Sequence, residues 1–171
     1  MSEETIIRRL GGDDAVDAVA SLLVLPYVWD NLDDCFHSLH GIFRLLRAVE
    51  DGRMRCYAAI DGTELVGAIV GEEQDGMFDG HFLMRLHRSA DLTRLRDRLL
   101  AAIRDDHAAD GRSVTAFRGR VPETNRACQR ACRRLGAKDM GIGDALFMRD
   151  GRAVPCRDFI LKLEDVWPSH Q

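Results

Sequence analysis

The sequence lacks any long apolar run. No uncharged stretch approaches the roughly 20 residues that a helix needs to cross a bilayer. The first ten residues, MSEETIIRRL, carry acids where a secretory signal is basic, and no long apolar stretch follows them. We therefore expect a cytoplasmic protein with no membrane partner.

An excess of positive charge is also missing. The chain has 24 Lys and Arg residues against 28 Asp and Glu residues, which gives a formal net charge of −4. We therefore expect no general attraction to nucleic acid. Arginine greatly outnumbers lysine, a bias that anion sites or a GC-rich genome would explain equally well.

The cysteines lack the CxxC spacing of many metal and redox sites. They are five, an odd number, so reduced thiols are expected rather than a disulfide framework. Cys128 and Cys132 lie one helical turn apart and can supply two metal ligands. A structural zinc needs two more at suitable spacing, and none lies nearby. We interpret both as small core residues.

A second group with metal-ligating atoms lies in CFHSLH, which contains Cys35, His37 and His40. His37 and His40 share one face of a helix at spacing i, i+3. A metal site would require that they meet His81, and nothing in the sequence brings them together. No metal is expected.

Hydrophobic periodicity predicts one α+β domain over residues 1–171, with helices on both faces of a mixed, mostly antiparallel sheet. The strand, helix and strand between 81 and 121 have room for a right-handed parallel crossover. In order, we predict strand 5–10, helix 13–25, a helix from 30 to before 52, strands 54–60 and 65–71, a polar loop 72–80, strand 81–87, helix 91–107, strand 113–121, helix 122–135, and strands 146–148 and 156–163.

This order of elements resembles the GNAT superfamily, the GCN5-related N-acetyltransferases, over about residues 5–163. The stretch AIDGTELVGAIVG looks like the family's second hairpin, and VPETNRACQRACRRLGA looks like a later motif. In that motif Val121, Asn125, Leu135 and Gly136 have the usual spacing. The resemblance implies transfer of an acetyl group from acetyl-CoA to a primary amine of a small molecule or protein, and homodimers are common in the superfamily. The departures described next are similar to those of diverged, phage-encoded members.

The sequence departs from the family at the pyrophosphate loop. The family's Arg/Gln-x-x-Gly-x-Gly/Ala signature cradles the pyrophosphate of coenzyme A on backbone N–H groups, and glycine permits the close approach. Counting back from Leu99 and Leu100 places this signature on residues 91–96, with an acid at Asp91 and arginine at Arg94 and Arg96. Side chains would then replace the glycine loop. The resemblance implies these cofactor contacts: Leu86, His87, Arg88, Arg94, Arg96 and Asn125.

The resemblance also gives candidate catalytic residues. Cys132 occupies the position where many members place a tyrosine as general acid, although a small packing residue would also fit there. His81, early in its strand, is the best candidate for the base, because imidazole titrates near neutral pH. A solvent-facing histidine is the alternative. Asn125 can cap its own helix and contact the cofactor as well.

The acceptor is expected near LPYVWDNLDDCFH, because the first two helices flank the acceptor site in this family. Tyr27 and Trp29 next to Asp30 suit a cationic amine. A core tryptophan with solvated acids explains the same residues. A second hypothesis is a non-catalytic GNAT-fold protein that binds a partner or ligand. A helix that begins early and covers the pyrophosphate path would favour that hypothesis.

Overall fold

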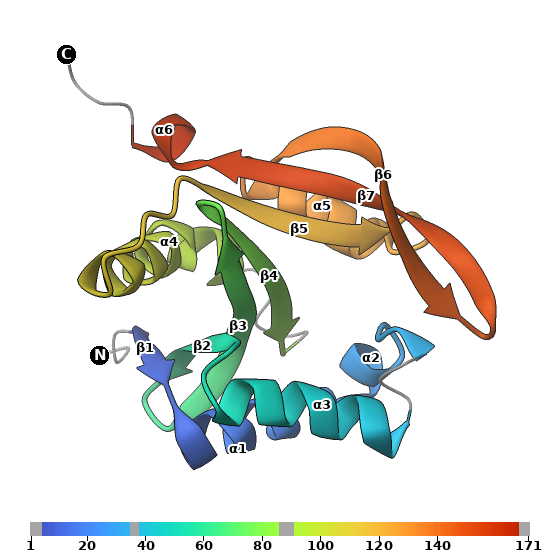
Figure 1. The fold of residues 1–171 in the computed structure, drawn as a ribbon, viewed down its shortest axis with the longest axis horizontal. Coiled ribbons are helices and arrows are strands. Elements are labelled where there is room, and N and C mark those ends of the chain that lie inside the picture. The colour runs from blue at the N-terminus through green and yellow to red at the C-terminus, as the bar shows by residue number, and fades with distance from the viewer. Residues whose placement is uncertain (1–4, 35–37, 86–90, 168–171) are drawn as a thin grey trace.

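The computed structural model describes residues 5–34, 38–85 and 91–167, and from 91 to 94 it describes the backbone alone. Within these residues one seven-stranded sheet has the order β1-β2-β3-β4-β5-β7-β6 (Figure 1). All neighbouring strands are antiparallel except β4 and β5, which confirms the mixed sheet. The strands are β1 (Ile6–Leu10), β2 (Arg55–Asp61), β3 (Glu64–Gln74), β4 (Met77–Met84), β5 (Ala116–Pro122), β6 (Lys138–Arg149) and β7 (Arg152–Lys162).

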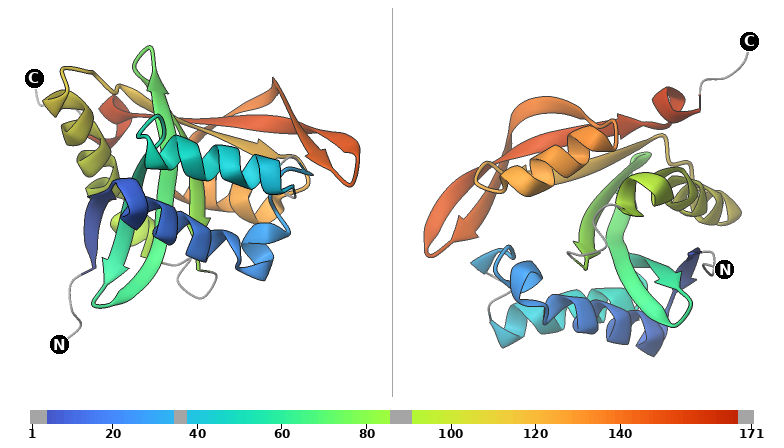
Figure 2. Two further views of the ribbon diagram at one scale, coloured as in Figure 1. Left: turned by 60° about the horizontal axis from the view of Figure 1, so that its bottom comes forward. Right: turned by 180° about the vertical axis from the view of Figure 1, so that it is seen from behind.

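Helices cover both faces of the sheet, as predicted (Figure 2). One group contains α1 (Gly12–Leu23), α2 (Pro26–Trp29) and α3 (Leu39–Glu50), and the other contains α4 (Asp91–Ala109) and α5 (Arg126–Arg134). A last turn, α6 (Leu163–Val166), follows β7. No helix of the described chain is long and apolar enough to cross a membrane.

The core divides into two main clusters because alternate strand residues point to opposite faces. On one face α1 packs Val19 and Leu22 against Cys56 and Val70. On the other face α4 packs side chains against β2, β3, β4 and β5; this cluster contains Tyr57, Ile69, Phe78, Leu99, Leu100, Ile103 and Phe117. The sheet therefore lies between two hydrophobic clusters, one under α1 and the other under α4.

The stretch EEQDGMFDG differs from the prediction of a polar loop. Here β3 runs to Gln74 and β4 begins at Met77, with only Asp75 and Gly76 between them. Both turn residues have positive φ, 53° and 79°, which Asp-Gly adopts readily in a tight hairpin. The acidic residues before the turn belong to β3, so the prediction that the strand ends at residue 71, which was based on polarity, was wrong.

Candidate functional site

The parallel strands β4 and β5 separate after a short contact. They pair only where Met77–Asp79 meets Ala116–Arg118. Beyond that point β4 remains paired with β3 as far as Met84, and β5 remains paired with β7 as far as Pro122. Figure 1 shows the two strands leaving the contact in different directions. We call the opening between them the strand gap.

His81 lies on β4 just beyond the last residue paired with β5. Its side chain shares a face with Leu83, which packs in the α1 cluster. His81 is exposed, which agrees with the alternative of a solvent-facing histidine, and desolvation by the surrounding protein lowers its pKa. Asp79 opposes this shift and Arg120 reinforces it. The ring is therefore neutral near pH 7 and able to accept a proton.

A carboxylate and two arginines bridge the two strands beside His81. The Nε group of Arg118 donates to Oδ1 of Asp79 at 2.8 Å, and Nη2 of Arg120 donates to Oδ2 at 3.0 Å. These charge-assisted bonds hold the strands together where the strand gap begins. The sequence analysis missed this cluster, because its residues are about 40 positions apart.

Helix α5 closes the far side of β5 and carries the predicted acid. Asn125 caps this helix by accepting from the Cys128 amide at 3.0 Å, as predicted. Cys132 is buried in a small cluster with Val121 and Phe159. A hydrogen bond with Cys128 and burial both raise the pKa of Cys132, so this thiol is protonated at neutral pH.

The region of the pyrophosphate signature is helical. Since α4 begins at Asp91, the amides of Leu95 and Arg96 fall inside its hydrogen-bonded turns. Because these two amides donate to carbonyls within the helix, they cannot bind a phosphate as the amides of a glycine loop would. The Arg96 side chain donates from Nε to Asp97 at 2.6 Å and from Nη1 to the Leu135 carbonyl at 3.0 Å. Arg96 thus ties α4 to the end of α5.

Several predicted contacts fall where the structure gives no description. They are Leu86, His87 and Arg88, together with Cys35 and His37 of the histidine cluster, and the side chain of Arg94. Their roles stay predictions. Within the described residues no group of three or more His, Cys, Asp and Glu side chains has the geometry of a metal site.

The predicted acceptor residues lie on and after α2. The Tyr27 hydroxyl donates to the Met84 carbonyl at the end of β4, so this ring is fixed against the strand gap. Trp29 is half-buried, and Asp30 is exposed at the end of α2. Their contact with an acceptor stays a prediction.

The segment after α2 is attached to the β6–β7 hairpin. Asp33 accepts from the Met148 amide at 2.6 Å, and Asp34 accepts from the amides of Asp150 and Gly151 at 3.0 and 2.8 Å. The acids predicted to be solvated thus bind backbone across 115 or more positions of the chain.

A pocket of about 280 Å³ opens beside this attachment. We call it the hairpin pocket. It lies between the segment after α2, the turn from β5 to α5, and the hairpin, and borders the strand gap where β5 ends. Its lining residues are Asn31, Pro122, Thr124, Asn125, Phe147 and Arg149.

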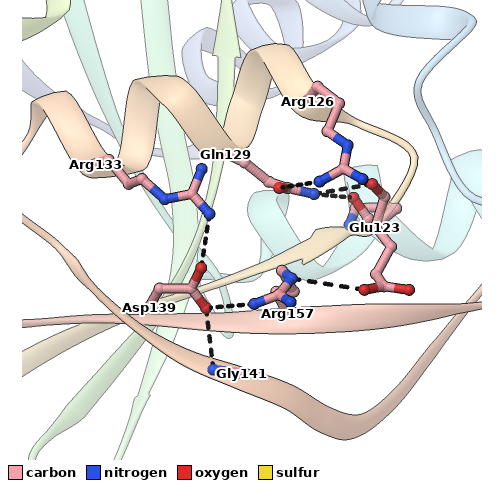
Figure 3. A network of polar contacts seen from close by, with 8 residues as sticks. Glu123, Arg126, Gln129, Arg133, Asp139, Gly141 and Arg157 are labelled. Carbon is pink, nitrogen blue, oxygen red and sulfur yellow. Dashed lines mark hydrogen bonds and ion pairs between the residues drawn. The ribbon is translucent and has the colours of Figure 1, made fainter.

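A buried glutamine fixes the turn that carries two of these lining residues. Gln129 is fully buried, and its Nε2 group donates to the carbonyls of Pro122 and Glu123 at 3.2 and 3.0 Å (Figure 3). On the sheet side, Asp139 accepts from Arg133 at 2.7 Å and from Arg157 at 2.9 Å. The network joins α5 to β6 and β7. No sequence signal marked Gln129, because a glutamine between arginines reads as a surface residue.

No protein-family model and no curated protein matches the chain in sequence. Solved structures do match it. An aminoglycoside N(6')-acetyltransferase from Legionella pneumophila is 13% identical, with a TM-score of 0.71 over 97% of this chain and 96% of that chain. A spermidine/spermine N-acetyltransferase from Vibrio cholerae is 12% identical, with a TM-score of 0.65 over 94% and 95%. An acetyltransferase from Salmonella typhimurium that modifies the N-terminal serine of ribosomal protein L7/L12 is 14% identical, with a TM-score of 0.66 over 93% and 96%. The chain therefore has the GNAT acetyltransferase fold.

Proposed function

We propose that the protein is an N-acyltransferase, which moves an acetyl or other acyl group from acetyl-CoA to a primary amine. The observation that supports this most directly is the strand gap, which separates β4 from β5 with His81 on one side and α5 on the other. The fold shared with enzymes acting on aminoglycosides, spermidine and a protein N-terminus agrees with an amine acceptor.

In the proposed reaction the bound donor supplies a thioester carbonyl. The amine nitrogen forms a bond to that carbon, the carbon–sulfur bond breaks, and the thiolate takes a proton, which yields an amide and a free thiol. His81 accepts the proton that the ammonium loses, because its lowered pKa keeps the imidazole neutral. The Cys132 thiol, which holds its proton and is buried beside Val121 and Phe159, is the proposed acid for the thiolate.

The helical start of α4 favours a second candidate, a non-catalytic GNAT-fold module. Because the amides of Leu95 and Arg96 are bonded within α4, the phosphates of coenzyme A need other groups to hold them. The side chains proposed for this are those of Arg88, Arg94 and Arg96.

Calorimetry and product analysis separate the two candidates. We expect acetyl-CoA to bind with micromolar affinity, Arg96→Ala to weaken it, and His81→Gln to slow amine-dependent release of coenzyme A by about 100-fold or more. His40→Gln, an exposed histidine on α3, is the matched control. Absence of binding at millimolar acetyl-CoA would reject acyl transfer from coenzyme A and favour the binding module.

A further inference from the structure

The lining of the hairpin pocket carries a single charged side chain. Among its six lining residues Arg149 is the only charged one, and no carboxylate is included. The nearest described ion pair of Arg149 is with Asp150 at 3.8 Å, and the Asp150 side chain is 89% exposed. Such a loose, solvated pair leaves the guanidinium able to bind an anion.

The neighbouring acids Asp33 and Asp34 are bound to the backbone of the hairpin and are not among the residues that line the pocket. Asp33 and Asp34 direct carboxylate oxygens to backbone amides of the hairpin. These bonds hold the segment after α2 against β6 and β7. The two acids therefore hold Asn31, which lines the pocket, close to the hairpin, and their own side chains do not line the pocket.

The uncharged polar groups of the pocket also fit a carboxylate. Asn125 uses its side-chain oxygen to cap α5, and within the described chain its amide Nδ2 group has no partner. Asn31 donates its Nδ2 group to the Tyr27 carbonyl at 2.7 Å. Together with the exposed Thr124 hydroxyl, Asn125 and Arg149 bring several donors to one small space.

We propose that the hairpin pocket selects an acceptor whose skeleton carries a carboxylate, so that the acceptor resembles an amino acid rather than a polyamine. Arg149 pairs with the carboxylate, and Phe147 contacts the apolar part of the molecule. The amine then extends past Pro122, the last residue of β5, toward the strand gap. A polycation would place positive charge against Arg149 and is disfavoured. This inference rests on the proposed acyl transfer, and it names the acceptor of that reaction.

The test compares each of three amino acids, glycine, leucine and phenylalanine, with its amide, which keeps the amine and removes the carboxylate. Spermidine is the polyamine probe. Calorimetry on the intact protein should show at least one acid binding about tenfold or more tightly than its amide and than spermidine, since charge-assisted pairs are strong. Arg149→Gln should reduce the ratio of acid to amide affinity to near one. Arg152→Gln, an exposed arginine of the same hairpin outside the pocket, should leave the ratio unchanged.

The outcomes separate this inference from the proposed function. Selective binding that Arg149→Gln abolishes supports the pocket assignment, even if no acetyl group is transferred from acetyl-CoA. Acetyl transfer to spermidine that is unaffected by Arg149→Gln would overturn the assignment and leave the acyltransferase intact. Failure of every acid to bind better than its amide would likewise overturn it.

Discussion

In the first four strands the sheet is covered by helices on both faces, whereas the last three carry the short α5 as their main covering helix. The α1 cluster lies in the first half, and the α4 cluster extends from Tyr57 of β2 to Phe117 of β5 and Leu161 of β7. Around α5 the buried cluster reduces to Val121, Cys132 and Phe159. Ion pairs and side-chain hydrogen bonds hold this second half together instead (Figure 3). From this comparison we expect the first half to contribute more to the free energy of unfolding, and the second half carries the surface around the hairpin pocket.

A buried polar network in the first half gives the largest expected effect. Asp106 on α4 accepts from the Tyr57 hydroxyl at 2.6 Å and from the guanidinium of Arg55, which is 7% exposed. Asp106→Leu would leave the Arg55 charge buried with fewer partners. We expect a loss of about 3 kcal/mol in the free energy of unfolding, measured by urea denaturation.

The control for that substitution is Asp105→Leu, because the neighbouring Asp105 is exposed and, among the described residues, is paired with Arg104 alone. An equal effect of the two substitutions would contradict the assignment of stability to the first half.

The second prediction concerns the polar interior of the other half. Gln129→Leu removes both hydrogen bonds to the turn after β5, and the Glu123 carbonyl loses its described donor, whereas the Pro122 carbonyl still accepts from the Asn125 amide at 2.9 Å. We expect a loss of about 2 kcal/mol, smaller than for Asp106 because no charge is buried. The exposed Gln74→Leu should change urea stability little. A loss larger than that of Asp106→Leu would reverse the order of the two halves.

The third prediction uses pH to sharpen the comparison. His107 on α4 is 1% exposed, stacks edge-on against Phe78, and has no described partner at either ring nitrogen. Burial lowers its pKa, Arg55 and Arg112 lower it further, and Asp106 and Glu73 oppose the shift. The unfolded state therefore binds a proton more readily, and this group decreases stability as the pH falls below about 6.5.

His107→Phe should remove that part of the pH dependence. We expect the variant to lose less thermal stability than the parent between pH 7 and pH 5, because a phenyl ring needs no partner. His40→Gln, which changes an exposed histidine, should keep the parent's dependence. Parallel pH curves for His107→Phe and the parent would show that this ring does not contribute.

The smallest effect is expected at Asp139, which joins α5 to β6 and β7. Hydrogen bonds from Arg133 and from the Gly141 amide lower its pKa below 3.8, so its contribution is present above that value and is lost as the pH falls through the lowered pKa. Asp139→Asn should lower the thermal midpoint slightly at pH 7, and the difference should disappear in acid. A drop as large as that for Gln129→Leu would indicate that ion pairs, not Gln129, hold this half.

Two structural details were predicted correctly where the signal was local, whereas the roles of the proposed site residues stay predictions. The cap at Asn125 and the burial of Cys132 follow from spacing within one helix. Residues far apart in the chain were not predicted to meet. The Arg118–Asp79 bridge and the attachment of Asp34 to the hairpin depend on strands and loops that only the completed sheet brings together.

The sequence by itself determined the order of elements, the α+β class and the missing glycines of the pyrophosphate signature, because periodicity and turn residues act over a few positions. Only the tertiary structure decided where β4 leaves β5 and that Arg149 lies in a pocket whose lining residues include no carboxylate. Strand pairing and pocket lining depend on contacts between distant segments, and a linear pattern of polar and apolar residues does not specify which distant side chains will share a space.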